Sequence, residues 1–200
     1  MIEKPILFSG QMVRAILDGK KTMTRRVVKN LDLIQDVNDG VPGFEDENGD
    51  WNLTADRCPY GQPGDRLWVR ETFSAGYDAG IPQKPGFGFS LAPFRGADSV
   101  KKVVYKASWN GEDQPPWKPS IHMKREYSRI LLEVVSVKVE RLEEISEEDA
   151  KAEGCQPRSD LDYAPLRWGF KELWDSINAK RGYGWGSNPW VWVISFKRIN

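Results

Sequence analysis

The sequence predicts an α+β fold in which strands outnumber helices, or a small barrel with helices at its flanks, in either case with long loop insertions. Strand-like runs rich in β-branched and aromatic residues recur along the chain, whereas helical periodicity is confined to three segments. Most strand-like runs follow one another directly, which favours antiparallel pairing. The chain has 200 residues, of which 40% are hydrophobic, so we expect one domain, residues 1–200, around one core.

The first elements are a short strand and a short helix. Residues 5–8, PILF, are apolar and predict a buried strand. Ser9 can cap a helix over residues 10–18, where four apolar side chains share one face. Gly19 is a natural stop because glycine adopts a left-handed conformation without a steric penalty. Residues 22–28 are then predicted to be extended.

The middle of the chain combines strands with loop-rich insertions at about residues 30–60 and 74–120. Asn48-Gly49 is a tight-turn signal, so a hairpin is expected within the acidic first insertion. Residues 66–73 alternate like a strand. In the second insertion, residues 74–99 are predicted to be a long loop or lid. Residues 101–107 are predicted to be a strand, and residues 109–120 a further loop.

The last third of the chain has the clearest signals. Residues 129–142 are the longest predicted strand. A helix over residues 145–154 should follow, with a capping box formed by Ser146 and Asp149, and with Gly154 as its stop. The remaining elements are a helix over residues 165–180 and a closing strand over residues 189–199.

The charge balance excludes a protein that coats nucleic acid by bulk electrostatics. Basic and acidic residues both number 29, so the formal net charge is zero. The distribution is uneven, because residues 31–50 hold seven acids and no Lys or Arg, while residues 101–129 hold seven bases and three acids. A neutral total can hide a basic face. The alternative is a set of ordinary solvated patches.

Cysteine and histidine usage predicts no metal site and no cofactor. The chain has two cysteines, Cys58 and Cys155, and one histidine, and neither a CxxC nor an HxxxH pattern occurs. No apolar run is long enough to cross a bilayer, and the N-terminus lacks a secretory apolar region. We therefore expect reduced thiols, no membrane partner and a cytoplasmic protein.

Nine tryptophans are a high number for this length. Trp109 and Trp117 fall in loops next to the basic run, where exposed aromatic rings suit stacking on nucleobases. The alternative is that these two rings pack as lids on the barrel. Four others lie in patterned elements and are predicted to be core residues: Trp168, Trp174, Trp190 and Trp192.

The segment after the first helix, GKKTMTRR at residues 19–26, is the strongest candidate for chemistry. On an extended path, side chains alternate faces, so Lys21 and Arg25 should point away from Thr24 and Arg26, although a turn near Gly19 would blur this. A desolvated lysine near a threonine hydroxyl can act as a base and activate it as a nucleophile. The alternative is a basic strand edge, where lysine discourages aggregation.

The segment ILDGKKTMTRR resembles the signature of the ASCH domain family, a helix followed by G-x-K-x-x-T-x-R. Gly19, Lys21, Thr24 and Arg26 match it. GQPGDRLWVRETF resembles the family's G-D-x-L strand, and ISEEDAKAEGC resembles its acid-bearing helix, with Glu153 at the acidic position. Through KPILFSG, PSIHM and SRILLEV, the chain looks like the ASCH-like proteins encoded in phages and prophages. The resemblance spans nearly the whole chain.

The resemblance implies a PUA-like fold, which is a small mixed β-barrel with helices at its side. It also implies a cleft where Lys21, Thr24, Arg26 and Glu153 meet, with RNA or a nucleotide-type ligand. In the small ASCH amidohydrolases, which cut the acyl-amide of N4-acetylcytidine, the matched Lys, Thr and Glu are catalytic. Carried over, Thr24 would be the nucleophile, Lys21 its base, and Glu153 a proton donor or an orienting group. Arg26 or a backbone N–H would stabilise the oxyanion. Lys21→Ala and Thr24→Ala should then each abolish turnover and leave the fold intact.

Several further residues are candidates for ligand binding. His122 would suit a phosphate or hydroxyl reaction, or it is a surface hydrogen-bonding residue. Ser128 and Arg129 at the entry to the longest strand suit phosphate, or they form a solvated strand end. Glu71 faces the cleft, or it pairs with Arg70 or with a nearby lysine. The predicted binding set around the cleft is Lys20, Arg25, Arg26, Glu71, His122, Ser128 and Arg129.

Four functions remain open at this point. The first is a non-catalytic RNA- or nucleotide-binding ASCH module, and the second is an amidohydrolase acting on N4-acylated cytidine-type nucleosides. The third is a ribonuclease that uses Lys21 and His122, and the fourth is a phage structural or interaction protein. The first three share a partner class, RNA or a modified nucleoside or nucleotide.

Overall fold

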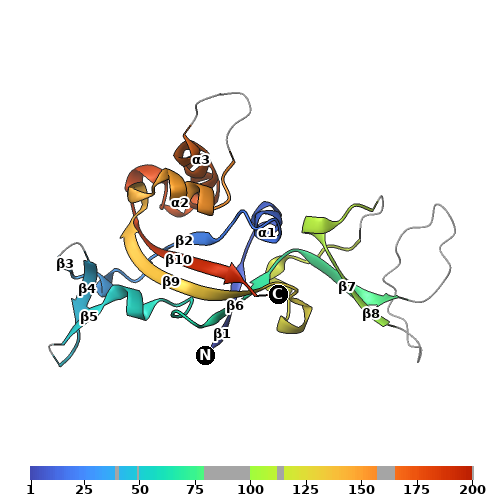
Figure 1. Ribbon diagram of the computed structural model, residues 1–200, viewed down its shortest axis with the longest axis horizontal. Helices are drawn as coiled ribbons and strands as arrows, with labels where there is room; N and C mark the ends of the chain where they lie inside the picture. The colour runs from blue at the N-terminus through green and yellow to red at the C-terminus, as the bar shows by residue number, and fades with distance from the viewer. Residues whose placement is uncertain (39–40, 49, 79–99, 112–114, 157–164, 200) are drawn as a thin grey trace.

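The computed structural model is of mixed α+β class, as predicted, with one five-stranded sheet and two smaller sheets (Figure 1). The structure describes residues 1–38, 41–48, 50–78, 100–111, 115–156 and 165–199.

The central sheet has the order β1-β6-β9-β10-β2. β1 pairs with β6 in parallel, and the other three pairings are antiparallel. β9 arches strongly across the molecule (Figure 1). Within the described residues β1 and β2 each have a hydrogen-bonded neighbour on one side only, so no pairing closes the sheet into the predicted barrel. The five strands are β1 (Glu3–Leu7), β2 (Met23–Val27), β6 (Arg66–Arg70), β9 (Leu131–Arg141) and β10 (Trp190–Arg198).

Both faces of β10 are buried, because alternate residues belong to two hydrophobic cores. Trp192 and Ile194 pack in one core with Val13 of α1 (Gly10–Leu17). Val191 and Val193 pack in the other core with residues of α2 (Glu147–Ala152) and α3 (Leu166–Asn178). The period-two alternation of a strand thus places α1 on one face of the sheet and α2 with α3 on the other.

The helix ends agree with the sequence signals. The Ser9 hydroxyl accepts a hydrogen bond from Met12 N at 3.4 Å, and the Ser146 hydroxyl accepts one from Asp149 N at 3.0 Å. Gly19 and Gly154 adopt the positive φ angles, +70° and +87°, that a left-handed stop requires. Short 3-10 helices cover Leu31–Leu33, Thr54–Arg57, Lys106–Ser108, Ser120–His122, Arg125–Tyr127, Leu142–Glu144, Ala179–Arg181 and Trp185–Ser187.

The first insertion forms a three-stranded antiparallel sheet of β3 (Asp36–Asn38), β4 (Val41–Glu45) and β5 (Trp51–Leu53). The pairing of β4 with β5 confirms the hairpin predicted around Asn48-Gly49, although Gly49 itself lies outside the described residues.

The second insertion differs from its prediction. The strand predicted over residues 66–73 ends at Arg70, and Phe73 instead begins β7 (Phe73–Asp78). β7 pairs with β8 (Val100–Tyr105), and this non-local pairing makes a strand of residues that were predicted as loop. Residues 79–99 of the predicted lid lie outside the described residues. The assignment of residues 1–200 to a single domain stays a prediction.

The tryptophan predictions are confirmed in part. Trp174 and Trp192 are buried, and Trp190 is partly buried. Trp168 is 60% exposed, so its prediction as a core residue is wrong. Residues i and i+2 of a helix point about 200° apart around its axis, so Trp168 faces solvent when Phe170 faces the core. Trp109 and Trp117 lie close to each other, edge to face, with ring centroids 6.0 Å apart.

The two cysteines are unpaired and buried. Within the described residues, no group of three or more His, Cys, Asp or Glu side chains is placed to hold a metal ion. The same part of the chain contains no helix with the length and apolar character needed to span a membrane.

Asp65 ties the start of β1 to the turn before β6. Its carboxylate accepts hydrogen bonds from Gln62 N at 3.0 Å and from Ile2 N at 2.7 Å. These two N–H groups hold the pKa of Asp65 below its usual range. Because the pKa of Asp65 is lowered in the folded state, its carboxylate stabilises the fold at pH values above its pKa in the unfolded chain. This contribution is lost as the pH falls through the folded-state pKa.

We therefore expect Asp65→Asn to be less stable than the parent protein at pH 7, with a difference that shrinks as the pH falls below about 4. Urea unfolding at a series of pH values measures this. Asp56→Asn, at an exposed carboxylate of the Thr54–Arg57 segment, is the matched control and should be about as stable as the parent protein at pH 7. A stability difference for Asp65→Asn that is constant across the pH range would contradict the expectation.

Candidate functional site

The GKKTMTRR segment turns sharply between α1 and β2. Gly19 is left-handed, and the backbone N–H groups of Lys20 and Lys21 both donate to Ala15 O, at 2.8 and 3.0 Å. Thr22 N then donates to Ala152 O, at the end of α2, at 2.8 Å. The turn therefore closes the C-terminal end of α1 and brings Lys21 against the C-terminal end of α2.

Lys21 is 2% exposed, and its ammonium group is saturated. Nζ donates to Met23 O at 2.7 Å, to Glu153 O at 2.8 Å and to Glu153 Oε2 at 2.6 Å, which uses all three of its N–H groups. Because Glu153 ends α2, the positive charge also sits favourably at a helix C-terminus. Burial lowers the pKa of Lys21, and the Glu153 carboxylate only partly offsets that effect.

Gly154 allows this close approach. A Cβ atom at Gly154 would lie 3.0 Å from Ala15 Cβ and 3.2 Å from Lys21 Cβ, and the residue has a φ of +87°. Both the space and the backbone conformation therefore require glycine. The predicted helix stop also serves as the contact point between α1, Lys21 and α2.

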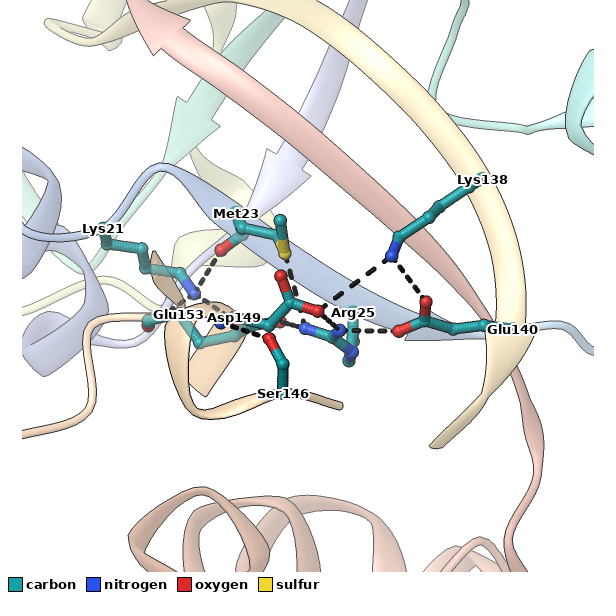
Figure 2. Close-up of polar contacts among 8 residues, drawn as sticks. All are labelled: Lys21, Met23, Arg25, Lys138, Glu140, Ser146, Asp149 and Glu153. Carbon is teal, nitrogen blue, oxygen red and sulfur yellow. Dashed lines mark hydrogen bonds and ion pairs between the residues drawn. The ribbon is translucent and has the colours of Figure 1, made fainter. Parts of the chain in front are cut away.

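Arg25 lies at the centre of a balanced ion network (Figure 2). Its Nη2 donates to Glu140 Oε1 at 2.6 Å and to Asp149 Oδ2 at 2.7 Å, and its Nη1 lies 3.5 Å from Glu153 Oε1. Lys138 contacts the other Glu140 oxygen at 2.6 Å. Three cations thus face three carboxylates, and we call this set the ion network: Lys21, Arg25, Lys138, Glu140, Asp149 and Glu153.

The network explains why the predicted capping box is only half formed. The Ser146 hydroxyl accepts from Asp149 N, as the box requires. The Asp149 carboxylate, which the box would return to the cap, binds Arg25 instead (Figure 2). A charge-assisted bond to a buried guanidinium is stronger than one to a neutral N–H, so the ion network takes this carboxylate.

A cleft of about 310 Å³ opens beside β2, and we call it the β2 cleft. Thr24, Arg25 and Arg26 of β2 and Glu153 of the ion network line it. The apolar side of α3 lines it too, including Trp174. The other lining residues are Leu7, Met12, Val27, Lys29, Tyr60, Phe170, Leu173, Ile177, Asn178, Arg181 and Tyr183.

The outer part of the β2 cleft is positively charged. Lys29 and Arg181 are exposed and have no acidic partner among the described residues. Arg26 donates from Nη2 to Leu7 O at 2.6 Å, and its guanidinium lies 5.2 Å from the ring centroid of Phe8. Glu153 is the one carboxylate among the described residues that line the cleft. A negatively charged group would therefore be attracted to the outer cleft.

Unsatisfied polar atoms gather at the same cleft. Glu153 Oε1, Arg25 Nε and Arg26 Nε are buried and have no hydrogen-bond partner within the described residues. Native proteins rarely leave buried polar atoms unpaired, and each such atom needs an explanation. A ligand with a hydrogen-bond donor for Glu153 Oε1 would satisfy that carboxylate oxygen.

The structure brings four predicted site residues together at the β2 cleft: Thr24, Arg25, Arg26 and Glu153. Lys21 contacts Glu153 but does not line the cleft, and within the described contacts no hydrogen bond joins it to the Thr24 hydroxyl. Lys20 has a side chain that is 55% exposed and lies 3.8 Å from Asp18.

Three other predicted residues lie outside the cleft and form a second group. The buried Glu71 carboxylate accepts two hydrogen bonds from Arg129, at 2.9 and 3.0 Å. The Arg129 guanidinium lies 4.1 Å from the ring centroid of Tyr105 in β8, and the Ser128 hydroxyl donates to Val69 O at 2.8 Å. This group joins β6 and β8 to the segment before β9. A ligand-binding role for its members stays a prediction.

His122 is exposed at the end of the 3-10 helix Ser120–His122 and does not line the β2 cleft. Lys21 is buried, so the two residues proposed for a ribonuclease do not share this cleft.

Sequence reasoning missed four residues of the cleft rim. Arg181 and Tyr183 flank Gly182, whose φ of +85° turns the chain after α3. The basic and aromatic turn KRGYG was a signal that could have been found. Lys29 and Tyr60 come from separate segments and carry no local signal of their own.

Cys155, next to the ion network, is not an activated thiol. Burial raises the pKa of Cys155 to about 11, and the Glu153 carboxylate adds to that effect. The thiol is therefore protonated at neutral pH and packs as an apolar side chain in the core beneath α3.

These observations define a mixed α+β protein with an ion network under a basic and aromatic cleft. No family model matches the sequence, and no curated protein matches it. Among solved structures, an ASCH domain from Lactobacillus crispatus JV V101 is similar, with 11% identity over 98% of this chain and 79% of that chain, at a TM-score of 0.43. A protein from Enterococcus faecalis V583 with the description DUF984 has 10% identity over 100% and 81%, also at 0.43. Likeness at this level carries no argument about the present chain.

Proposed function

We propose that this protein is an ASCH-like module that binds RNA or a nucleotide in the β2 cleft. The observation that carries the proposal is Glu153 Oε1, a buried carboxylate oxygen without a hydrogen-bond donor, at a cleft with a basic and aromatic rim. The match of residues 19–26 to the ASCH signature supports the same ligand class. A prophage origin and a cytoplasmic location stay predictions.

The open oxygen of Glu153 favours a base with an exocyclic amino group. Lys21 donates to the other oxygen, Oε2, and Arg25 Nη1 lies 3.5 Å from Oε1 without donating a hydrogen bond to it, so Oε1 can accept one from a ligand. Cytosine, adenine and guanine each carry an amino donor, whereas the donor of uracil, N3–H, lies between two carbonyl oxygens that a carboxylate repels. Hydrogen bonds to a charged acceptor are worth more than neutral ones, so a base with an amino group should be selected.

The rim supplies the groups that the rest of a nucleotide requires. Lys29 and Arg181 are exposed cations without acidic partners among the described residues, and they suit a phosphate group. Tyr60 and Tyr183 offer rings beside them, which suit stacking on a base or a sugar. Because the phosphate contact is electrostatic, binding should weaken as salt is added.

Titration of the purified protein with CMP, AMP, GMP and UMP, followed by tryptophan fluorescence at low salt, tests the proposal. At least one amino-bearing nucleotide should bind about tenfold more tightly than UMP, because hydrogen bonds to charged groups are worth about 1.5–3 kcal/mol. Lys29→Ala and Arg181→Ala should each weaken that binding.

The matched control for these two variants is Lys124→Ala, an exposed lysine that does not line the β2 cleft, and its affinity should equal that of the parent protein. Absence of binding to all four nucleotides and to short RNA would contradict the proposal.

A second candidate function is hydrolysis of an acylated amino group on the same base. Two observations favour it: Thr24 and Glu153 line one cleft, and burial lowers the pKa of Lys21. The Thr24 hydroxyl would attack the acyl carbonyl and form an acyl ester as the C–N bond breaks, and the hydroxyl proton would pass to the leaving amino group of the free base. Water would then hydrolyse the ester and release the carboxylic acid. The saturated ammonium group of Lys21 favours a binding site over this reaction.

Incubation with N4-acetylcytidine, followed by chromatography, decides between the two candidates. A hydrolase releases cytidine and loses that activity in Thr24→Val. Lys21→Ala is not a suitable control, because this buried residue holds α2 and its loss is expected to unfold the site. If no cytidine is released at high enzyme concentration, the hydrolase function is excluded and the binding function remains.

A further inference from the structure

We propose that the ligand of the β2 cleft is a single-stranded polynucleotide that continues into a second cavity at Arg141 and Trp190. This inference rests on the proposed function and extends it, because it assigns the class of ligand and a second subsite. A free mononucleotide would fill only the first of the two cavities.

The second cavity adjoins the β2 cleft. It has a volume of about 410 Å³, and Lys29 and Tyr183 line both cavities. Val27 of β2 lines the first cavity, and the next residue, Val28, lines the second. The two cavities therefore follow one another along the chain at the end of β2, and Lys29 and Tyr183 are common to both.

The second cavity offers a surface for a nucleobase. The Arg141 guanidinium lies 4.3 Å from the ring centroid of Trp190, and Arg141 Nη1 donates to Asn188 O at 3.1 Å, which fixes the group in place. Bases stack on guanidinium planes and on aromatic rings in complexes with single-stranded RNA. No Asp or Glu is among the described residues that line this cavity, so a phosphate nearby meets no repulsion from the lining.

The border between the cavities suits the phosphodiester that joins two nucleotides. Lys29 is exposed there without an acidic partner among the described residues. Two features hold the backbone of Tyr183, the left-handed Gly182 before it and a hydrogen bond of 2.7 Å from Trp174 Nε1 to Tyr183 O. Proteins that bind a single strand combine aromatic rings with basic side chains in this way.

The cavities favour a single strand over a duplex. Each has the volume of a small-molecule site and is recessed between secondary-structure elements. The bases of a duplex are stacked and paired, so they cannot enter two separate recesses. A single strand can place one base in each cavity and its phosphates along the rim.

Leu31 gives a direct test, because this side chain lines the second cavity and is 61% exposed, so its substitution does not disturb the core. The probes are the mononucleotide that binds the β2 cleft most tightly and the 5′-phosphorylated dinucleotide of the same base. The dinucleotide should bind about tenfold more tightly, because each added stacked base contributes at least about fivefold. Leu31→Arg should tighten dinucleotide binding severalfold, and Leu31→Glu should weaken it, and mononucleotide binding should change less in both variants.

Ile121 provides the matched control. It is 59% exposed and lines neither cavity, so Ile121→Arg and Ile121→Glu should leave both affinities unchanged. The dinucleotide is tested in its RNA and DNA forms. Tighter binding of the dinucleotide than of the mononucleotide, in either form, supports the proposal.

The inference is overturned if the dinucleotide binds no more tightly than the mononucleotide, or if the two Leu31 variants do not differ. In either case, mononucleotide binding would leave the proposed function standing. If neither probe binds, both the inference and the proposed function fail.

Discussion

Lys21→Met should lower the free energy of unfolding by about 3–5 kcal/mol, the usual cost of removing one partner from a buried ion pair. The side chain is buried, and its loss leaves the Glu153 carboxylate without its closest cation. Two backbone carbonyl groups, Met23 O and Glu153 O, also lose their donor. Urea unfolding at pH 7 measures the change.

Two further variants identify the cause of this effect. Lys20→Met removes the neighbouring lysine, which is exposed, and should change stability by less than about 0.5 kcal/mol. The double variant Lys21→Met with Glu153→Leu removes both charges and should recover most of the loss, because an apolar pair of similar size often replaces a buried ion pair without cost. Equal stability of the two single variants would show that the Lys21 ion pair does not hold α2.

Arg25→Met is expected to have an effect at least as large, with a loss of about 3–5 kcal/mol or more. The guanidinium contacts Glu140 and Asp149 by hydrogen bonds and lies within ion-pair distance of Glu153. Without it, the three carboxylates face only Lys21 and Lys138. Thermal unfolding should show a decrease in Tm of about 10 °C, given about 2–4 °C per kcal/mol for a chain of this size.

The conservative variant separates charge from geometry. Arg25→Lys keeps the charge but cannot reach Glu140 and Asp149 with one planar fork, so we expect a Tm between those of the parent protein and Arg25→Met. Lys124→Met, at an exposed position, is the control and should unfold at the parent temperature. An Arg25→Met protein as stable as this control would mean that the ion network does not stabilise the fold.

The elements that sequence predicted well are those specified locally. α1 has a cap at Ser9 and a stop at Gly19, both within hydrogen-bonding distance of the helix itself. The 11 residues of β9 are rich in β-branched side chains, and α3 repeats its apolar side chains with the helical period. In each case neighbouring residues carry the information, so tertiary contacts were not needed to find the element.

The elements that were missed depend on distant partners. Phe73–Asp78 becomes a strand because β8 pairs with it, although its own sequence contains Gly76 and Ser74. Barrel closure likewise depends on whether the edge strands β1 and β2 pair, which a local pattern does not specify. Propensity is a weak guide where pairing decides the outcome.

The candidate site was predicted in part. The motif match anticipated that Thr24 and Glu153, far apart in sequence, would line one cleft, and the structure places both there. Composition could not show that Lys21 donates all three of its N–H groups, since that depends on where α2 ends. The rim was missed because Lys29, Tyr60 and Arg181 come from three separate segments.

A crystal structure with the nucleoside monophosphate that binds most tightly tests the central claim most directly. We expect the amino group of its base within hydrogen-bonding distance of Glu153 Oε1, and its phosphate beside Lys29 or Arg181. A nucleotide bound elsewhere, for example at the pair formed by Glu71 and Arg129, with Glu153 Oε1 still unpaired, would contradict the assignment of the β2 cleft as the ligand site.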